Sequence, residues 1–249
     1  MTPRVLTDVL SPVINQTGIP TASSQVRSVG CFASLRDARL AYGINALCWP
    51  RDLAGDFGEV VAALGPGEGL VPLDESRLQA LALSPAGQVA RAVMLADLRL
   101  LRDHGLAPEL NCIYAYPRDE DPVVFPTDVY SWHADSAPIE TATWLCTYHG
   151  APSEGLPNAQ ARRQADDPAI RAELWRAYGG QDEAEFTAFL REHAYDLHYA
   201  ASPDAQPWSF GVGHLWRIAV DWPGNPVPPC IHRAPPQPAD PSPRLLLIS

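Results

Sequence analysis

The sequence contains no lysine, and all 18 of its basic residues are arginines. They stand against 29 aspartates and glutamates, which gives a formal net charge of −11. Without lysine the chain has no side-chain amine for Schiff-base chemistry and no P-loop for nucleotide phosphates. An acidic protein also repels nucleic acids and anionic membrane surfaces. We therefore expect small molecules or a protein as partners, with a small-molecule substrate favoured and arginine as the only permanent anion-binding side chain.

Several other patterns are missing as well. The five cysteines are scattered and form no C-x-x-C pair, which excludes zinc-ribbon and thioredoxin-like sites. No apolar run approaches the roughly 18 residues that span a membrane. Asp8 and Pro12 interrupt the short apolar run at the N-terminus, unlike a signal peptide. No G-x-S-x-G elbow is present. These absences predict a cytoplasmic protein with reduced thiols.

The chain is long enough for one large domain. It has 249 residues, and 46% of them are hydrophobic. We expect a single domain over 1–249, made of an N-terminal segment with supporting helices (1–107) and a strand-rich core (108–249). In the first part, Asp74 predicts the start of a short helix. Ser84 followed by proline predicts a longer helix that ends before Gly105, whose core stripe is formed by Val89, Val93, Ala96 and Leu100.

The core is expected to consist mainly of strands. The candidate strands are 42–49, 111–116, 123–125, 139–148, 208–210, 215–220 and 244–249. Two helical patterns, which start at Asp167 and Asp182, predict a helical insertion at about 158–200. This order of elements predicts an α+β fold built on a β-sandwich or jelly roll, with helices packed on one side.

One group of residues has the composition of a metal site. His133 and Asp135 lie two apart on a predicted strand and therefore face the same side. Together with His232 they would supply two imidazoles and one carboxylate, the donor set that holds Fe(II) on one face and leaves other positions open. Arg244 follows His232 by twelve residues, and its guanidinium could pair with a carboxylate behind the metal.

Two points of this reading have alternatives. His133 could be a core histidine bonded to Asp135, with His232 in a loop, although an unpaired carboxylate beside apolar Trp132 and Ala134 would be costly. Tyr148 is a further candidate for cofactor binding. Its alternative is a core tyrosine with a bonded hydroxyl.

The H-x-D motif, the distal histidine and the arginine a dozen residues later resemble the Fe(II)/2-oxoglutarate-dependent oxygenase superfamily over 130–249. The chain is also similar to an uncharacterised bacterial family of this type in three stretches: 44–51, 132–135 with 145–150, and 232–235. The resemblance implies a double-stranded β-helix core. It implies His133, Asp135 and His232 as iron ligands and Arg244 as the partner of the distal carboxylate of 2-oxoglutarate.

The resemblance also implies a reaction. A dioxygenase of this kind uses Fe(II), 2-oxoglutarate and O₂ to oxidise a C–H bond, here in a small molecule, by hydroxylation or another outcome. Two alternatives remain open. The first is a cupin-like metalloenzyme that does not use 2-oxoglutarate, and the second is a non-catalytic metal-binding β-sandwich.

Overall fold

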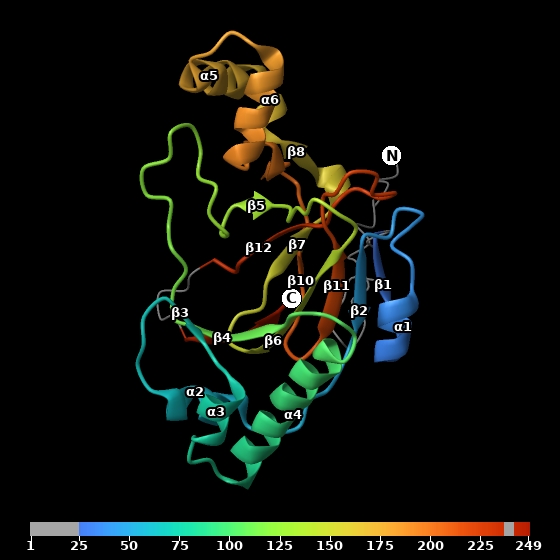
Figure 1. Ribbon diagram of the computed structural model, residues 1–249, viewed down its shortest axis with the longest axis vertical. Helices are drawn as coiled ribbons and strands as arrows, with labels where there is room; N and C mark the ends of the chain where they lie inside the picture. Colours follow the sequence, from blue (N-terminus) through green and yellow to red (C-terminus); the bar gives the residue numbers. More distant parts are fainter. Residues whose placement is uncertain (1–24, 237–241) are drawn as a thin grey trace, which may run out of the picture.

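The computed structural model describes residues 25–236 and 242–249, so residues 1–24 of the expected N-terminal segment lie outside it. The fold is α+β, with two curved sheets that face each other (Figure 1). The larger sheet has seven strands in the order β1 (Val26–Ser28), β2 (Ala46–Trp49), β11 (Leu215–Ala219), β6 (Ala142–His149), β13 (Arg244–Ile248), β4 (Glu109–Ile113) and β3 (Leu70–Pro72). Three of these strands come from the N-terminal segment, which therefore contributes to the sheet as well as supporting it.

The smaller sheet has six strands. Their order is β10 (Trp208–Ser209), β7 (Glu154–Leu156), β12 (Ile231–Arg233), β5 (Trp132–His133), β9 (His198–Ala201) and β8 (Ala161–Arg163). All pairs in both sheets are antiparallel except β1 with β2.

From β4 onward the chain passes back and forth between the two sheets, except that β7, β8, β9 and β10 lie in succession in the smaller one. Strands β4, β6, β11 and β13 lie in the larger sheet, and β5, β7, β10 and β12 lie in the smaller one. Each sheet thus holds a block of four adjacent strands, β11-β6-β13-β4 facing β10-β7-β12-β5. This arrangement puts residues from both sheets around one shared interior.

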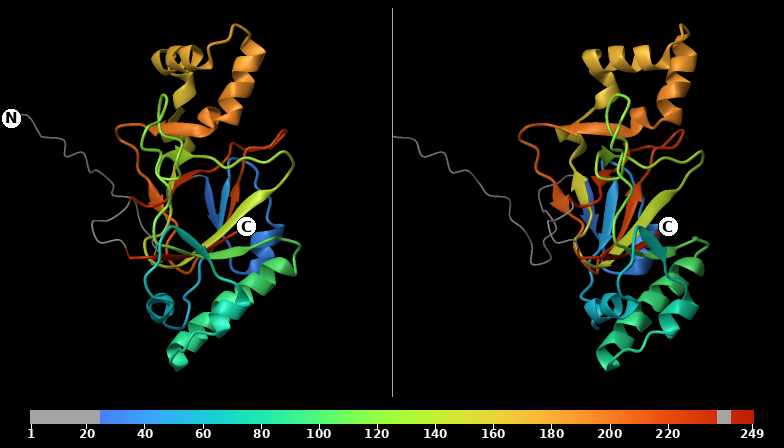
Figure 2. Two further views of the ribbon diagram at one scale, coloured as in Figure 1. Left: turned by 60° about the vertical axis from the view of Figure 1, so that its left-hand side comes forward. Right: turned by 90° about the vertical axis from the view of Figure 1, so that its left-hand side faces the viewer.

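Helices cover the outer face of the larger sheet. They are α1 (Phe32–Asp37), α2 (Phe57–Leu64), α3 (Glu75–Gln79) and α4 (Pro85–Arg102). The predicted starts are confirmed: Asp74 accepts from the Arg77 amide, and Ser84 accepts from the Gly87 amide. Figure 2 shows α4 crossing one end of the molecule, under the sheet. The described helices include none that is long and apolar enough to cross a bilayer.

The predicted core stripe of α4 is wrong at two of its four positions. Val89 is 44% exposed and Ala96 is also exposed, whereas Val93 and Leu100 are half-buried and pack against the core. The buried face instead contains Ala90, Met94, Asp97, Leu98 and Leu101. The apolar pattern missed this face because Asp97 belongs to it, buried against Arg51 at 2.7 Å.

The larger sheet is buried on both faces. One core lies between it and the helices, with Cys146, Tyr148 and Leu245 among its members. A second core, with Leu145 and Leu246, lies on the other face, toward the smaller sheet. The nearly continuous apolar sequence of β6 follows from this double burial.

The helical insertion joins β7 to β10. Its helices are α5 (Pro168–Tyr178) and α6 (Glu183–Glu192), with short 3-10 turns at Asn158–Gln160, Gln164–Asp166 and Tyr195–Leu197. Figures 1 and 2 show it standing at the end of the molecule opposite α4. Residues 123–125 form no strand, against the prediction. Phe125 instead packs into the core of the insertion, with its ring 4.9 Å from that of Tyr195.

Candidate metal centre

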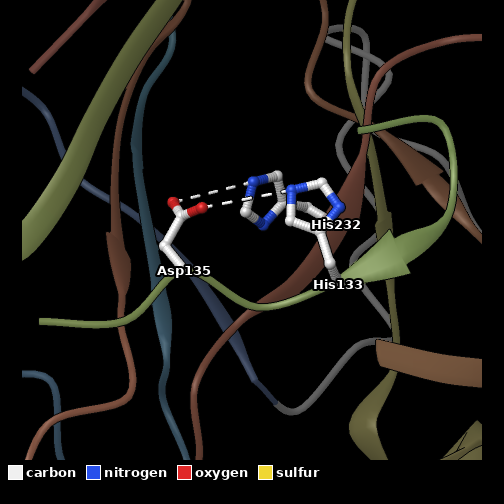
Figure 3. Close-up of side chains that lie close together, drawn as sticks. All are labelled: His133, Asp135 and His232. Carbon is white, nitrogen blue, oxygen red and sulfur yellow. Dashed lines mark ion pairs between the residues drawn. The ribbon is translucent and has the colours of Figure 1, made fainter. Parts of the chain in front are cut away.

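His133 and His232 face each other across neighbouring strands of the smaller sheet. Strands β5 and β12 are antiparallel, and these two histidines are direct register partners. Their rings lie 4.5 Å apart. Asp135 follows the end of β5, where its backbone oxygen accepts from the Asp221 amide at 2.8 Å. The strand is shorter than expected, but the H-x-D spacing still brings the carboxylate back toward the rings (Figure 3).

The three side chains converge through specific atoms. Nε2 of His133 lies 4.0 Å from Oδ1 of Asp135, and Nε2 of His232 lies 3.7 Å from Oδ2 (Figure 3). One donor atom from each residue falls within 4.8 Å of the other two. The carboxylate is one-third exposed, while the two imidazoles are 14% and 12% exposed, so the group is largely shielded and still reachable.

The two imidazoles are oriented in the same way. Nδ1 of His133 lies 2.8 Å from the Ser131 carbonyl oxygen, and Nδ1 of His232 lies 3.2 Å from that of Cys230. A carbonyl oxygen only accepts, so a neutral ring in this position carries its proton on Nδ1. The Nε2 lone pair of each ring is then free and points at the shared centre. Metal-binding histidines are commonly fixed by backbone carbonyls in this manner.

The electrostatics of the group favour metal binding at neutral pH. Burial lowers the pKa of His133 to about 4, and His232 adds to the effect, so His133 is neutral. Burial alone would raise the pKa of Asp135. The neighbouring His232 and His133 and the hydrogen bond from Thr143 outweigh burial and hold that pKa below its usual value. Among the described residues Asp135 pairs with no arginine, so its charge is left for another cation.

The group opens into a cavity of about 170 Å³ between the two sheets. Most of its wall is apolar and includes Ile113, Leu145 and Leu246. Its polar wall residues, beyond the three described above, are Asn111, Tyr116, Thr143 and Ser153. An apolar cavity with a few converging polar groups is the usual form of a small-molecule site.

Arg244 is buried, at 6% exposure, and does not itself line the cavity, but it contacts two of the wall residues. Its Nη1 donates to the Tyr116 hydroxyl at 3.0 Å, and its Nη2 donates to Ser153 at 3.1 Å and to Thr147 at 3.4 Å. The buried Nε has no acceptor among the described residues. Its hydrogen-bond acceptors among the described residues are thus all neutral hydroxyls, and burial lowers its pKa. A buried guanidinium without a counter-anion is suited to bind one.

Tyr148, the other candidate for cofactor binding, lies elsewhere. It points to the helix-covered face of the larger sheet, where its hydroxyl donates to Oδ2 of Asp97 at 2.6 Å and its ring stacks on Phe57. Strand alternation explains this position, because Thr143 and Thr147 of the same strand reach the cavity side. The structure gathers the three metal-ligand candidates in the wall of one cavity, places Arg244 against two other wall residues, and leaves Tyr148 out.

Four residues of the site were not among the sequence-based candidates: Thr143, Tyr116, Thr147 and Ser153. The alternation of β6 would have indicated the two threonines, because Thr143, Leu145 and Thr147 share a face. Tyr116 and Ser153 lie outside regular strands, and nothing in their local sequence distinguishes them.

Comparison of this chain with protein-family models, with curated proteins and with solved structures finds no match.

Proposed function

We propose that the protein is a mononuclear non-haem iron oxygenase that uses 2-oxoglutarate and O₂ to oxidise a C–H bond of a small molecule. The observation that carries the proposal is the pairing of two features at one cavity. A two-histidine, one-carboxylate group lies in its wall, and a buried arginine, which has no counter-anion among the described residues, donates hydrogen bonds to two other wall residues, Tyr116 and Ser153.

The division of strands between the sheets supports a double-stranded β-helix for the core. Eight strands form two facing four-stranded blocks, β11-β6-β13-β4 and β10-β7-β12-β5, and the chain changes block at every step except from β7 to β10, as expected of a jelly roll. The resemblance carried by the H-x-D motif, the distal histidine and the arginine points to the same fold.

In the proposed reaction His133, Asp135 and His232 would hold Fe(II) through two Nε2 atoms and one carboxylate oxygen. Bound iron supplies the site for O₂ activation and for chelation of the 2-oxo acid. Overall, 2-oxoglutarate, O₂ and R–H give succinate, CO₂ and R–OH.

The chain itself contributes binding and orientation. Arg244 would pair with the distal carboxylate of 2-oxoglutarate, and the hydroxyls of Tyr116, Thr147 and Ser153 hold the guanidinium in place for it. The apolar walls limit access of water to the reacting atoms.

We also place the protein in the cytoplasm. All five cysteines are free thiols, and four of them are buried, as expected of a protein kept in a reducing compartment. The net charge of −11 favours a small-molecule substrate over nucleic acid.

An anaerobic titration tests the proposal. Metal-free protein receives Fe(II) and then 2-oxoglutarate, and the weak visible metal-to-ligand charge-transfer band is followed. We expect the band in the wild type and its loss in His133→Ala and Asp135→Ala. Iron binding without a band would favour a cupin-like metalloenzyme that does not use 2-oxoglutarate. Failure to bind iron would mean that the three residues are structural.

A further inference from the structure

Thr143 makes the one side-chain hydrogen bond to Asp135 found among the described residues. Its hydroxyl donates to Oδ2 of Asp135 at 2.5 Å. Thr143 lies near the start of β6 in the larger sheet, whereas Asp135 follows β5 of the smaller sheet. The bond therefore crosses the cavity from one sheet to the other, and Thr143 is itself buried.

The backbone of Asp135 is held without Thr143. Its carbonyl oxygen accepts from the Asp221 amide at 2.8 Å, and the Ala137 amide donates to the Asp221 oxygen at 2.9 Å. These bonds fix the position of the Asp135 main chain, but they do not fix the orientation of its carboxylate plane. The χ2 torsion of aspartate is broad, so rotamer preference does not set that plane either. The hydroxyl of Thr143 supplies the missing restraint.

The two oxygens of Asp135 are consequently different. Oδ2 accepts from Thr143 and lies 3.7 Å from Nε2 of His232, while Oδ1 lies 4.0 Å from Nε2 of His133 and accepts no hydrogen bond from a described residue. We propose that Thr143 is a positioning residue that keeps Asp135 a one-oxygen metal ligand. The inference rests on the proposed function, because a carboxylate bound through both oxygens would take up a position that the 2-oxo acid or O₂ needs.

Thr147 provides a matched control on the same strand. It lies four residues after Thr143, also reaches the cavity side, and its hydroxyl accepts from Nη2 of Arg244 at 3.4 Å. Both threonines are buried. Replacing either one by valine removes a hydroxyl at nearly constant shape, but only Thr143 touches a metal-ligand candidate.

The experiment measures metal binding without turnover. Metal-free wild type, T143V, T143S and T147V are titrated anaerobically with Co(II), whose visible d–d bands report affinity and coordination number. A hydrogen-bonding partner of a metal ligand typically contributes about 10–100-fold to metal affinity. We expect T143V to lose affinity in that range and to show changed d–d bands, T143S to recover most of the loss, and T147V to match the wild type.

Each outcome of the titration either supports or overturns the proposed role of Thr143. Equal affinity and unchanged bands in T143V would overturn the role of Thr143 and leave the proposed function standing. An equal loss in T143V and T147V would show general damage to β6, which also overturns it. A wild type that binds no Co(II) or Fe(II) would overturn the proposed function and this inference together. Thermal unfolding of all four metal-free proteins shows that they are folded before titration.

Discussion

The two faces of the larger sheet each bury an arginine, and the two arginines differ in how completely they are partnered. On the helix side, Arg51 pairs with Asp97 at 2.7 Å and donates through Nε to the Gly213 carbonyl oxygen at 2.9 Å. This pairing raises the pKa of Arg51 in spite of burial. On the cavity side, Arg244 donates hydrogen bonds only to hydroxyls among the described residues, its Nε has no acceptor among them, and burial lowers its pKa.

The difference distinguishes a charge pair that stabilises the fold from charges that are available to bind a ligand. On the helix side, Arg51 and Asp97 neutralise each other within the fold, so no ligand is needed to balance their charges. Charge on the cavity side is not balanced, neither at Arg244 nor at Asp135, and burying an unbalanced charge costs free energy. Under the proposed function, an anion at Arg244 and a metal cation at Asp135 would balance these charges.

The largest effect is expected from breaking the balanced side. Arg51→Met would leave Asp97 buried without its cation, which typically costs about 3–5 kcal/mol. Urea unfolding of the metal-free protein measures the free energy directly. A loss below about 1 kcal/mol would show that Asp97 finds another partner and that the pair is not what balances this face.

Acid should weaken the cavity side selectively. The pKa of His133 is about 4 in the folded protein against 6.5 for the free side chain, so the unfolded chain binds more protons between these values. Stability of the metal-free protein is then fully present above pH 6.5 and falls as the pH drops toward 4, by at most about 3 kcal/mol. Unfolding free energies across this range should fall less steeply in His133→Asn. Identical slopes in the two proteins would contradict the buried neutral state of His133.

A smaller effect is expected at Tyr148. Its hydroxyl donates to the Asp97 carboxylate at 2.6 Å, and hydrogen bonds to charged groups contribute about 1.5–3 kcal/mol. Tyr148→Phe should lower the free energy of unfolding by about that amount while leaving affinity for 2-oxoglutarate unchanged. A change in that affinity would show that Tyr148 contributes to the cavity site, in spite of its position on the helix-covered face.

The smallest effect on stability is expected at Arg244. Arg244→Met removes a buried charge that has no counter-anion, so the free energy of unfolding should stay within about 1 kcal/mol of the wild type or rise. The same variant should lose the increase in melting temperature that 2-oxoglutarate gives the iron-loaded wild type. Destabilisation as large as that of Arg51→Met would mean that the two faces do not differ.

Local features of the fold could be predicted from the sequence. Asp74, Ser84 and Asp167 each begin a helix as expected, since capping depends on neighbouring residues only. The H-x-D spacing and the distal histidine predicted a group that the structure does bring together. Its use as a metal site remains a prediction.

Features that depend on distant partners could not be predicted. The buried face of α4 includes Asp97, whose burial follows from Arg51, 46 residues earlier in the chain. The bond from Thr143 to Asp135 exists only because the two sheets face each other. Phe125 was predicted to lie in a strand because the local sequence does not show its contacts in the core of the insertion. Those contacts are with distant residues such as Tyr195.

The two ends of the helical insertion meet at a hairpin. Strands β7 and β10 pair through Gly155 with Trp208 and Glu154 with Ser209, so residues 157–207 start and end at the same place in the smaller sheet, and their strands β8 and β9 also belong to it. Closing a longer loop costs little extra free energy, so the helical part of this segment can be lengthened or shortened without moving the strands that carry the metal-ligand candidates. The segment nevertheless returns strand β9 to the edge of β5, with His198 beside His133. Changes in this segment can therefore alter what lies next to His133 without changing the three metal-ligand candidates themselves.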